Sequence, residues 1–355
     1  MPDTREGAIH LEILITGGNG FLGRNLILAL QERGDNVRVL ALPTEDTTWL
    51  KERDVAVFHG DILNPDALIA PMRGVEGVFH LAAMIGAWRA MQDYYAVNVT
   101  GTENVCQAAL EAGVRRLLHI SSAMVYDMTI GRAVTEDDPL KPLDEPYSLT
   151  KAQGDMLVQR MIREDHLPAV IIRPGTLIGP GDRLNFGRMA DRVRAGKGII
   201  IGSGNNAVPF VYVTDMVQGL LLALDCERAV GKVYNIGNDQ ALTQKVFLST
   251  IAQEIGVKTP HIHVPYYPLY TAAYAAERIA MFSNNRIPPF VTRHGVKLYG
   301  ADNRLSISKA RRELGYTPKV PLIEAVRITC DWYQHEDTWI PGTVPVGVPQ
   351  AAKVT

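Results

Sequence analysis

Short hydrophobic runs alternate with amphipathic stretches along the first half of the chain. Leu11–Thr16 is an apolar run, and Phe21–Arg33 has apolar residues at helical spacing. Long helices are predicted at Asp93–Ala112 and Tyr147–Asp165. The same pattern predicts further strands at Asn36–Leu42, Val55–Phe58, Val75–Ala82, Arg115–Ser121 and Ala169–Arg173. Because strands that alternate with helices favour right-handed crossovers, we predict an α/β fold with a Rossmann-type, doubly wound parallel sheet.

The alternation ends after Pro174, where glycines and prolines become frequent. We assign residues 11–174 to a dinucleotide-binding domain and residues 175–335 mainly to a smaller, discontinuous substrate-binding domain. Val233–Ile236 is expected to return to the main sheet as a strand. The two ends of the chain show no such pattern and are expected to be flexible, at residues 1–10 and 341–355.

Composition and charge exclude several classes of function. The 355 residues carry a net charge of −2 with both signs interspersed, so no nucleic-acid surface is expected. The three cysteines lie far apart and match no zinc or redox spacing, so we expect no metal site. A reducing compartment, the cytoplasm, agrees with this use of cysteine and with an N-terminus that lacks the apolar segment of a signal peptide.

No stretch of the sequence reaches the about 20 apolar residues that a membrane-spanning helix needs. The nearest is Val264–Phe282, which contains Pro268, Glu277 and Arg278. It is expected to form an aromatic-rich helix in the wall or lid of the substrate domain. A peripheral contact with a membrane is the alternative.

A glycine-rich turn lies between the first predicted strand and the first predicted helix. Its glycines allow a tight turn, close approach of the backbone to a pyrophosphate, and close packing of helix on strand. We assign the turn to a dinucleotide through Gly17, Gly20, Phe21, Leu22 and Gly23. The end of the second strand usually selects the cofactor, but Ala41 and Leu42 are neither acidic nor basic. We expect NAD, with NADP as the alternative, because no basic residue closes that strand.

Tyr147 and Lys151 are four residues apart, on one face of a predicted helix. A free tyrosine has a pKa of about 10 and is a poor base at neutral pH. A lysine beside it favours the phenolate, so Tyr147 can exchange a proton with a substrate hydroxyl. Lys151 can also bind the cofactor ribose. A serine at the predicted strand end, Ser121–Ser122, would orient the substrate oxygen.

Together these motifs resemble the extended short-chain dehydrogenase/reductase superfamily over residues 11 to 335. Other motifs that carry the resemblance are Gly60-Asp61-Ile62, His80-Leu81-Ala82-Ala83, Asn98-Val99-Thr100-Gly101-Thr102 and Arg173-Pro174-Gly175. The resemblance implies that Ser122, Tyr147 and Lys151 are the catalytic residues. It implies a homodimer through the helices at 93–112 and 147–165. Further cofactor contacts are implied at Asp61, Ile62, Leu81, Ala82, Ala83, Asn98, Lys151 and Pro174.

Two branches of this superfamily are candidates for this sequence. One contains nucleotide-sugar epimerases and dehydratases; the other contains 3β-hydroxysteroid and sterol-4-carboxylate dehydrogenases and related reductases of β-keto acids. Enzymes of the sugar branch typically carry an arginine that contacts the diphosphate, where this chain has Val208. We therefore expect an alcohol dehydrogenase or ketone reductase acting on a small, largely apolar molecule, in a pocket formed by Met84, Trp88, Met124 and Tyr126.

Two alternatives stay open from the sequence. A nucleotide-sugar 4-epimerase or dehydratase would use the same residues with tightly bound NAD. A catalytically idle dinucleotide-binding protein would need only the glycine turn, and the complete serine, tyrosine and lysine set argues against it.

Overall fold

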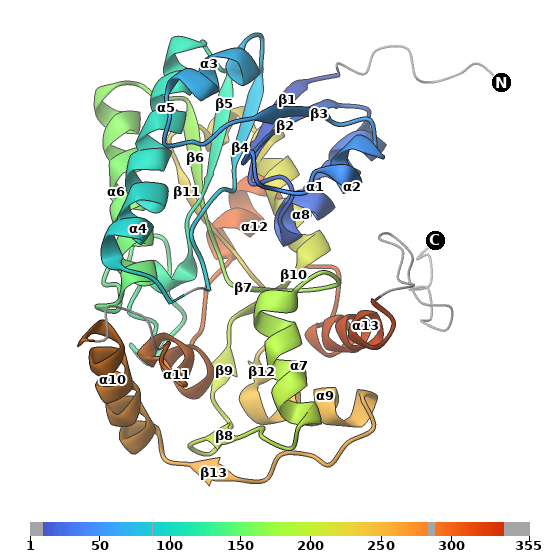
Figure 1. Cartoon of the computed structure of the whole chain (residues 1–355), viewed down its shortest axis with the longest axis vertical. Coiled ribbons are helices and arrows are strands. Elements are labelled where there is room, and N and C mark those ends of the chain that lie inside the picture. Colours follow the sequence, from blue (N-terminus) through green and yellow to red (C-terminus); the bar gives the residue numbers. More distant parts are fainter. Residues whose placement is uncertain (1–9, 87, 283–287, 337–355) are drawn as a thin grey trace, which may run out of the picture.

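The computed structural model describes residues 10–86, 88–282 and 288–336, and its centre is a seven-stranded sheet (Figure 1). Every strand pair in this sheet is parallel. The strand order reverses between β1 and β4, which confirms the predicted Rossmann-type sheet. From one edge to the other the strands are β11 (Val233–Ile236), β6 (Ala169–Pro174), β5 (Arg116–Ile120), β4 (Gly77–His80), β1 (Glu12–Thr16), β2 (Asn36–Ala41) and β3 (Ala56–His59).

Helices cover both faces of the sheet. Because successive side chains of a strand point to opposite faces, Ile13 and Ile15 pack in one apolar cluster and Leu14 in another. The first cluster includes side chains of α1 (Phe21–Arg33), α8 (Val213–Asp225) and α12 (Ser308–Leu314). The second includes α3 (Asp66–Met72), α5 (Thr102–Glu111) and α6 (Pro146–Glu164), while α2 (Thr48–Lys51) contacts β3.

Short strand pairs and helices form the lower part of the molecule in Figure 1. A third apolar cluster fills this part and contains Phe186, Phe210 and Phe247. The strand pairs are β7 (Thr176–Ile178) with β10 (Phe210–Tyr212), β9 (Ala207–Val208) with β12 (Leu242–Thr243), and β8 (Ile200–Ile201) with β13 (His263–Val264). The helices are α7 (Arg188–Arg194), α9 (Gln244–Glu254), α10 (Tyr266–Phe282), α11 (Arg293–Gly300) and α13 (Leu322–Gln334), and a 3-10 turn, η4 (Glu227–Ala229), follows α8.

The long helix predicted over residues 93–112 is interrupted. It consists of α4 (Met91–Tyr95), a π-helical segment η1 (Ala96–Gly101) and α5. A Cβ on Gly154 of α6 would lie 2.5 Å from the carbonyl oxygen of Asn98, so the two helical segments touch through backbone. π-Helical turns of this kind are frequent at functional sites, and local periodicity alone does not predict them.

The aromatic-rich segment forms α10, which packs on α11 through an ion pair between Glu277 and Arg293, 2.6 Å apart. Its outer side exposes Tyr267, Ile279 and Phe282, the last at 84%. Within the described residues, no helix is both long and apolar enough to cross a bilayer. Both expectations for this helix, the wall of the substrate domain and a peripheral membrane contact, stay predictions.

The flexible tail expected at residues 341–355 lies outside the described residues, as does all of the N-terminal segment before His10.

Candidate active site

The glycine-rich turn connects β1 to α1 and packs directly against the backbone beyond β4. Gly17 has a φ of +73°, and a Cβ there would lie 2.8 Å from the backbone nitrogen of Ala82. A Cβ on Gly23 would lie 2.5 Å from the carbonyl oxygen of Gly18. Only glycine fits these two positions. Because α1 begins without a side-chain cap, its first N–H groups are available to a pyrophosphate, and the turn fits a dinucleotide.

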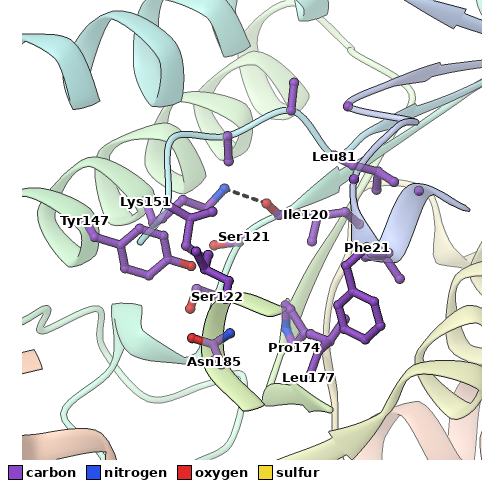
Figure 2. Close-up of a pocket in the computed structure, with 18 of the residues that line it drawn as sticks. Phe21, Leu81, Ile120, Ser121, Ser122, Tyr147, Lys151, Pro174, Leu177 and Asn185 are labelled. Atoms are coloured by element: carbon purple, nitrogen blue, oxygen red, sulfur yellow. Dashed lines mark hydrogen bonds between the residues drawn. The ribbon is translucent and has the colours of Figure 1, made fainter. Parts of the chain in front are cut away.

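A cavity of about 660 Å³ runs along the carboxyl ends of the parallel strands, where such sheets bind ligands (Figure 2). It brings together residues from β1, β4, β5, β6 and α6 that are far apart in the sequence. The predicted residues in its walls are Gly17, Gly20, Phe21, Leu22, Gly23, Asp61, Ile62, Leu81, Ala82, Ala83, Ser122, Met124, Tyr147, Lys151 and Pro174.

One end of the cavity contains an acidic residue that the sequence analysis missed. Glu45 lines the cavity beside Leu42 and Asp61. Its N–H donates to the Leu42 carbonyl at 3.0 Å, which closes a turn directly after β2. Burial raises the pKa of Glu45, and His59 opposes that rise. The sequence analysis considered Ala41 and Leu42 at the strand end and did not weigh this residue three positions further on.

Tyr147 and Ser122 lie next to each other in the cavity wall (Figure 2). Ser122 precedes the 3-10 helix η2 (Ala123–Val125), and its hydroxyl accepts a hydrogen bond from the Met124 N–H, 3.1 Å. Burial raises the pKa of Tyr147 to about 12, although a hydrogen bond with Ser122 lowers it in part. In the protein alone, Tyr147 is therefore a protonated phenol and a proton donor.

Lys151 lies one helical turn further along α6. Its ammonium donates to the Ile120 carbonyl at 2.6 Å, shown dashed in Figure 2. Burial lowers the pKa of Lys151 to about 8, and Asp155 opposes this shift. The sequence analysis expected Lys151 to lower the pKa of Tyr147. In the protein without cofactor this is corrected, because burial raises that pKa and the Lys151 ammonium donates to a backbone carbonyl.

The neighbouring serine, Ser121, has a structural role. Its hydroxyl donates to the Asp155 carboxylate at 2.6 Å. Asp155 also accepts two hydrogen bonds of 2.8 Å from Arg173, and both side chains are buried. This network joins the ends of β5 and β6 to α6. It leaves Ser122, not Ser121, as the hydroxyl next to Tyr147.

Asn98 supports the site from outside the cavity wall. Its side-chain oxygen accepts from the Met84 N–H at 2.8 Å, and its amide donates to the Met84 carbonyl at 3.2 Å and to Thr150 at 3.0 Å. The loop after β4 is thereby joined to α6. Instead of the expected cofactor contact, the structure gives Asn98 a positioning role, since it does not line the cavity.

Of the four residues expected to bind substrate, only Met124 lines the cavity in the part of the chain that the structure describes. Met84 and Trp88 lie outside its walls, next to residue 87, which is not described. Tyr126 is 1% exposed; its hydroxyl donates to Asn235 at 3.1 Å and accepts from Arg173. The η2 turn directs this side chain into the core, so the expectation for Tyr126 is corrected.

Further wall residues come from segments whose sequence shows no local motif. Leu184 and Asn185 belong to a π-helical turn, η3 (Arg183–Gly187), and the Asn185 amide points toward Ser122 in Figure 2. His294 comes from the first turn of α11, and its ring contacts Tyr147 edge to face at 5.4 Å. Only the tertiary fold brings these residues to the site.

Comparison with known proteins gives a consistent result. The profile of the NAD dependent epimerase/dehydratase family matches residues 13–237, more than half of the chain. The chain is 32% identical to a sterol-4-alpha-carboxylate 3-dehydrogenase, decarboxylating, from Mus musculus, over 90% of each chain. It is 30% identical to a 2-alkyl-3-oxoalkanoate reductase from Stenotrophomonas maltophilia, over 89% of this chain and 98% of that protein.

A solved dTDP-glucose 4,6-dehydratase from Streptomyces venezuelae, with NAD bound, superposes with a TM-score of 0.76. It is 26% identical and matches 93% of this chain and 98% of its own. These similarities agree with the glycine-rich turn and the parallel sheet. They also agree with the presence of Ser122, Tyr147 and Lys151 at the carboxyl ends of the strands. The chain belongs to the NAD dependent epimerase/dehydratase family of extended short-chain dehydrogenases/reductases, on the hydroxysteroid dehydrogenase-like side, and is an NAD-dependent oxidoreductase.

Proposed function

We propose that this enzyme interconverts a secondary alcohol and a ketone on a largely apolar substrate whose reacting carbon is β to a carboxylate. The observation that carries the proposal is that Ser122 and Tyr147 line the same cavity as the glycine turn. The apolar side chains of Met124, Leu184 and Leu298 line this cavity too. The two relatives named above act, by their names, on a sterol 4-carboxylate and a 3-oxoalkanoate.

The chain's own residues supply proton transfer and orientation. In reduction, the Tyr147 hydroxyl donates its proton to the substrate carbonyl oxygen, which Ser122 holds by a second hydrogen bond. In oxidation the transfer runs in reverse, from the substrate hydroxyl to Tyr147 in its phenolate form, which positive charge beside the ring favours. When bound, NAD would supply the hydride acceptor for oxidation and, in its reduced form, the hydride donor for reduction. Lys151 binds the nicotinamide ribose and places a positive charge near the phenol.

Glu45 supports the choice of NAD over NADP. Glu45 lines the cavity shortly after β2, and an acidic residue after this strand binds the free ribose hydroxyls in NAD-dependent folds of this type. A 2′-phosphate in that place would bring like charges together without a compensating cation. We therefore infer NAD as the preferred cofactor of this chain.

The nucleotide-sugar alternative is weaker. Val208 is 1% exposed, in β9, and provides no cation for a diphosphate. Arg183 does line the cavity, but its guanidinium is paired with Glu336 and stacked over Trp332 at 5.3 Å. A diphosphate would have to displace that carboxylate.

The test is NADH formation by the purified enzyme with NAD⁺ and three alcohols: 2-hexyl-3-hydroxydecanoate, a 3β-hydroxysteroid and UDP-glucose. We expect steady NADH production with the hydroxy acid or the steroid, and none with UDP-glucose. Conversion of UDP-glucose to its 4-epimer without net NADH would support the epimerase instead. If none of these alcohols yields NADH and none of the matching ketones oxidises NADH, the result would favour the alternative of a catalytically idle dinucleotide-binding protein.

A further inference from the structure

His294 occupies a position next to the reacting groups that the mechanism above does not use. It follows the N-cap of α11, where the Thr292 hydroxyl accepts from the Gly295 N–H. The side chain is 27% exposed, and it lines the cavity. Its ring lies 5.4 Å from the Tyr147 ring, at 86°. A ligand that contacts this imidazole from the cavity therefore lies near the Tyr147 side chain.

Glu145 determines which ring nitrogen faces the cavity as a donor. It caps α6 by accepting from the N–H groups of Tyr147 and Ser148, and it lies 3.3 Å from Nδ1 of His294. Burial acts to raise the pKa of Glu145, but the hydrogen bond and charge of His294 and the Ser148 donors hold it below its ordinary value. The carboxylate is thus ionised, and Nδ1 carries a proton toward it.

The second nitrogen, Nε2, has no hydrogen-bond partner within the described residues. A ring that faces carboxylates at both nitrogens can donate to both only in the doubly protonated form, with Nε2–H as a charged donor. Such charge-assisted hydrogen bonds are about twice as strong as neutral ones.

The other cations of the cavity wall are already paired. The three basic side chains among its described lining residues are Lys151, Arg183 and His294. Lys151 donates to the Ile120 carbonyl, and Arg183 pairs with Glu336. Among these three, His294 is the basic side chain whose ring contacts the Tyr147 ring, so it is the one beside the reacting groups that the mechanism leaves unassigned.

We propose that His294, oriented by Glu145, binds the substrate carboxylate through Nε2–H and so selects β-hydroxy and β-keto acids over neutral alcohols and ketones. This proposal rests on the proposed function and deepens it, since it assigns the substrate's charge to one residue. His294 is then a specificity residue, and Glu145 is the positioning residue behind it.

The test compares 2-hexyl-3-hydroxydecanoate with its methyl ester, as NAD⁺-dependent kcat/KM, in the wild type and two variants. Asparagine at 294 retains a polar group at the place of Nδ1 but none at Nε2; glutamine retains a donor near Nε2. We expect His294→Asn to lower kcat/KM for the acid about tenfold or more, mainly through KM, with the ester little changed. His294→Gln is expected to recover part of that loss.

The outcomes separate the two proposals. If the wild type oxidises acid and ester equally well, or if His294→Asn weakens both alike, His294 does not bind the carboxylate, although the proposed reaction stands. A purely structural role predicts the reverse order, with His294→Asn tolerated and His294→Gln impaired for both compounds. If the wild type oxidises neither compound, the function proposed for this acid fails, and the His294 assignment fails with it.

Discussion

At the scale of single residues, burial controls the chemistry of this site more than neighbouring charge does. The pKa values of Tyr147 and Lys151, the pair on α6, move in opposite directions from their ordinary values. The pKa of Tyr147 rises to about 12, and the pKa of Lys151 falls to about 8. Burial disfavours the charged form of each, the phenolate in one case and the ammonium in the other. In the protein without cofactor the phenol therefore stays protonated over the working range of pH, and the lysine is the group that titrates within it.

This predicts how activity depends on pH. Lys151 is an ammonium below a pH of about 8 and neutral above it, while Tyr147 stays protonated to about 12. Ketone reduction that needs the ammonium to hold the ribose should therefore decline as pH rises through about 8. The measurement is kcat/KM for NADH against pH, since this ratio follows the free enzyme. A profile that stays flat to well above that pH would contradict the role given to Lys151.

The same shift affects stability with a definite sign. Between a pH of about 8 and the ordinary lysine value, the unfolded chain binds a proton at Lys151 that the folded chain does not. Stability from this group therefore rises with pH through that window and is lowest below it.

A second residue-scale prediction concerns Glu45 and the choice of cofactor. Replacing its carboxylate, Glu45→Gln, should raise the thermal midpoint shift produced by NADP⁺ relative to that produced by NAD⁺, because the repulsion of the 2′-phosphate is removed. Asp46→Asn is the matched control, since Asp46 is the exposed neighbour and does not line the cavity. A wild type that is stabilised more by NADP⁺ than by NAD⁺ would reject the assignment.

At the scale of elements, the site depends on close contacts between backbone segments, which only glycine permits. The turn between β1 and α1 leaves no room for a Cβ at Gly23, which would lie 2.5 Å and 2.6 Å from the carbonyl oxygens of Gly18 and Gly17. Likewise, α6 can approach the π-helical segment only because Gly154 has no side chain.

Gly23→Ala should therefore abolish the thermal stabilisation by NAD⁺ and destabilise the fold, since the alanine methyl forces the turn open. Gly295→Ala is the control, because it puts the same methyl in the first turn of α11, at an ordinary 3.4 Å contact with Thr292. If Gly23→Ala binds NAD⁺ as well as the control does, the turn is not the pyrophosphate cradle.

At the scale of the whole molecule, features with local signals were predictable from sequence and features made by tertiary contact were not. The strands, the helix Phe21–Arg33 and the glycine turn follow from periodicity and position, and the structure agrees with them. Glu45 was missed because it lies in the turn after β2 and not at the strand end itself. His294 was missed because it lies about 150 residues from its neighbours in the site, Glu145 and Tyr147, with no local motif.

The homodimer that the family resemblance implies stays a prediction at this scale. Its surface would be the outer side of α4, η1, α5 and α6, where Tyr95 is 47% exposed and Met156 is 49% exposed. Met156→Glu should convert a dimer to a monomer in light scattering, because it places a charge in an apolar contact. Met281→Glu is the control, because Met281 is an exposed methionine on α10, at 41%. A wild type that is monomeric at micromolar concentration would contradict the prediction.

The central claim is that Tyr147 transfers the proton while hydride moves between NAD and the substrate carbon. The most direct measurement is the NAD⁺-dependent oxidation of 2-hexyl-3-hydroxydecanoate by Tyr147→Phe against the wild type, with NAD⁺ binding followed by thermal shift. The account predicts that kcat falls by about 100-fold or more while the NAD⁺ shift is preserved. A variant that binds NAD⁺ normally and retains more than a few per cent of wild-type turnover would contradict it.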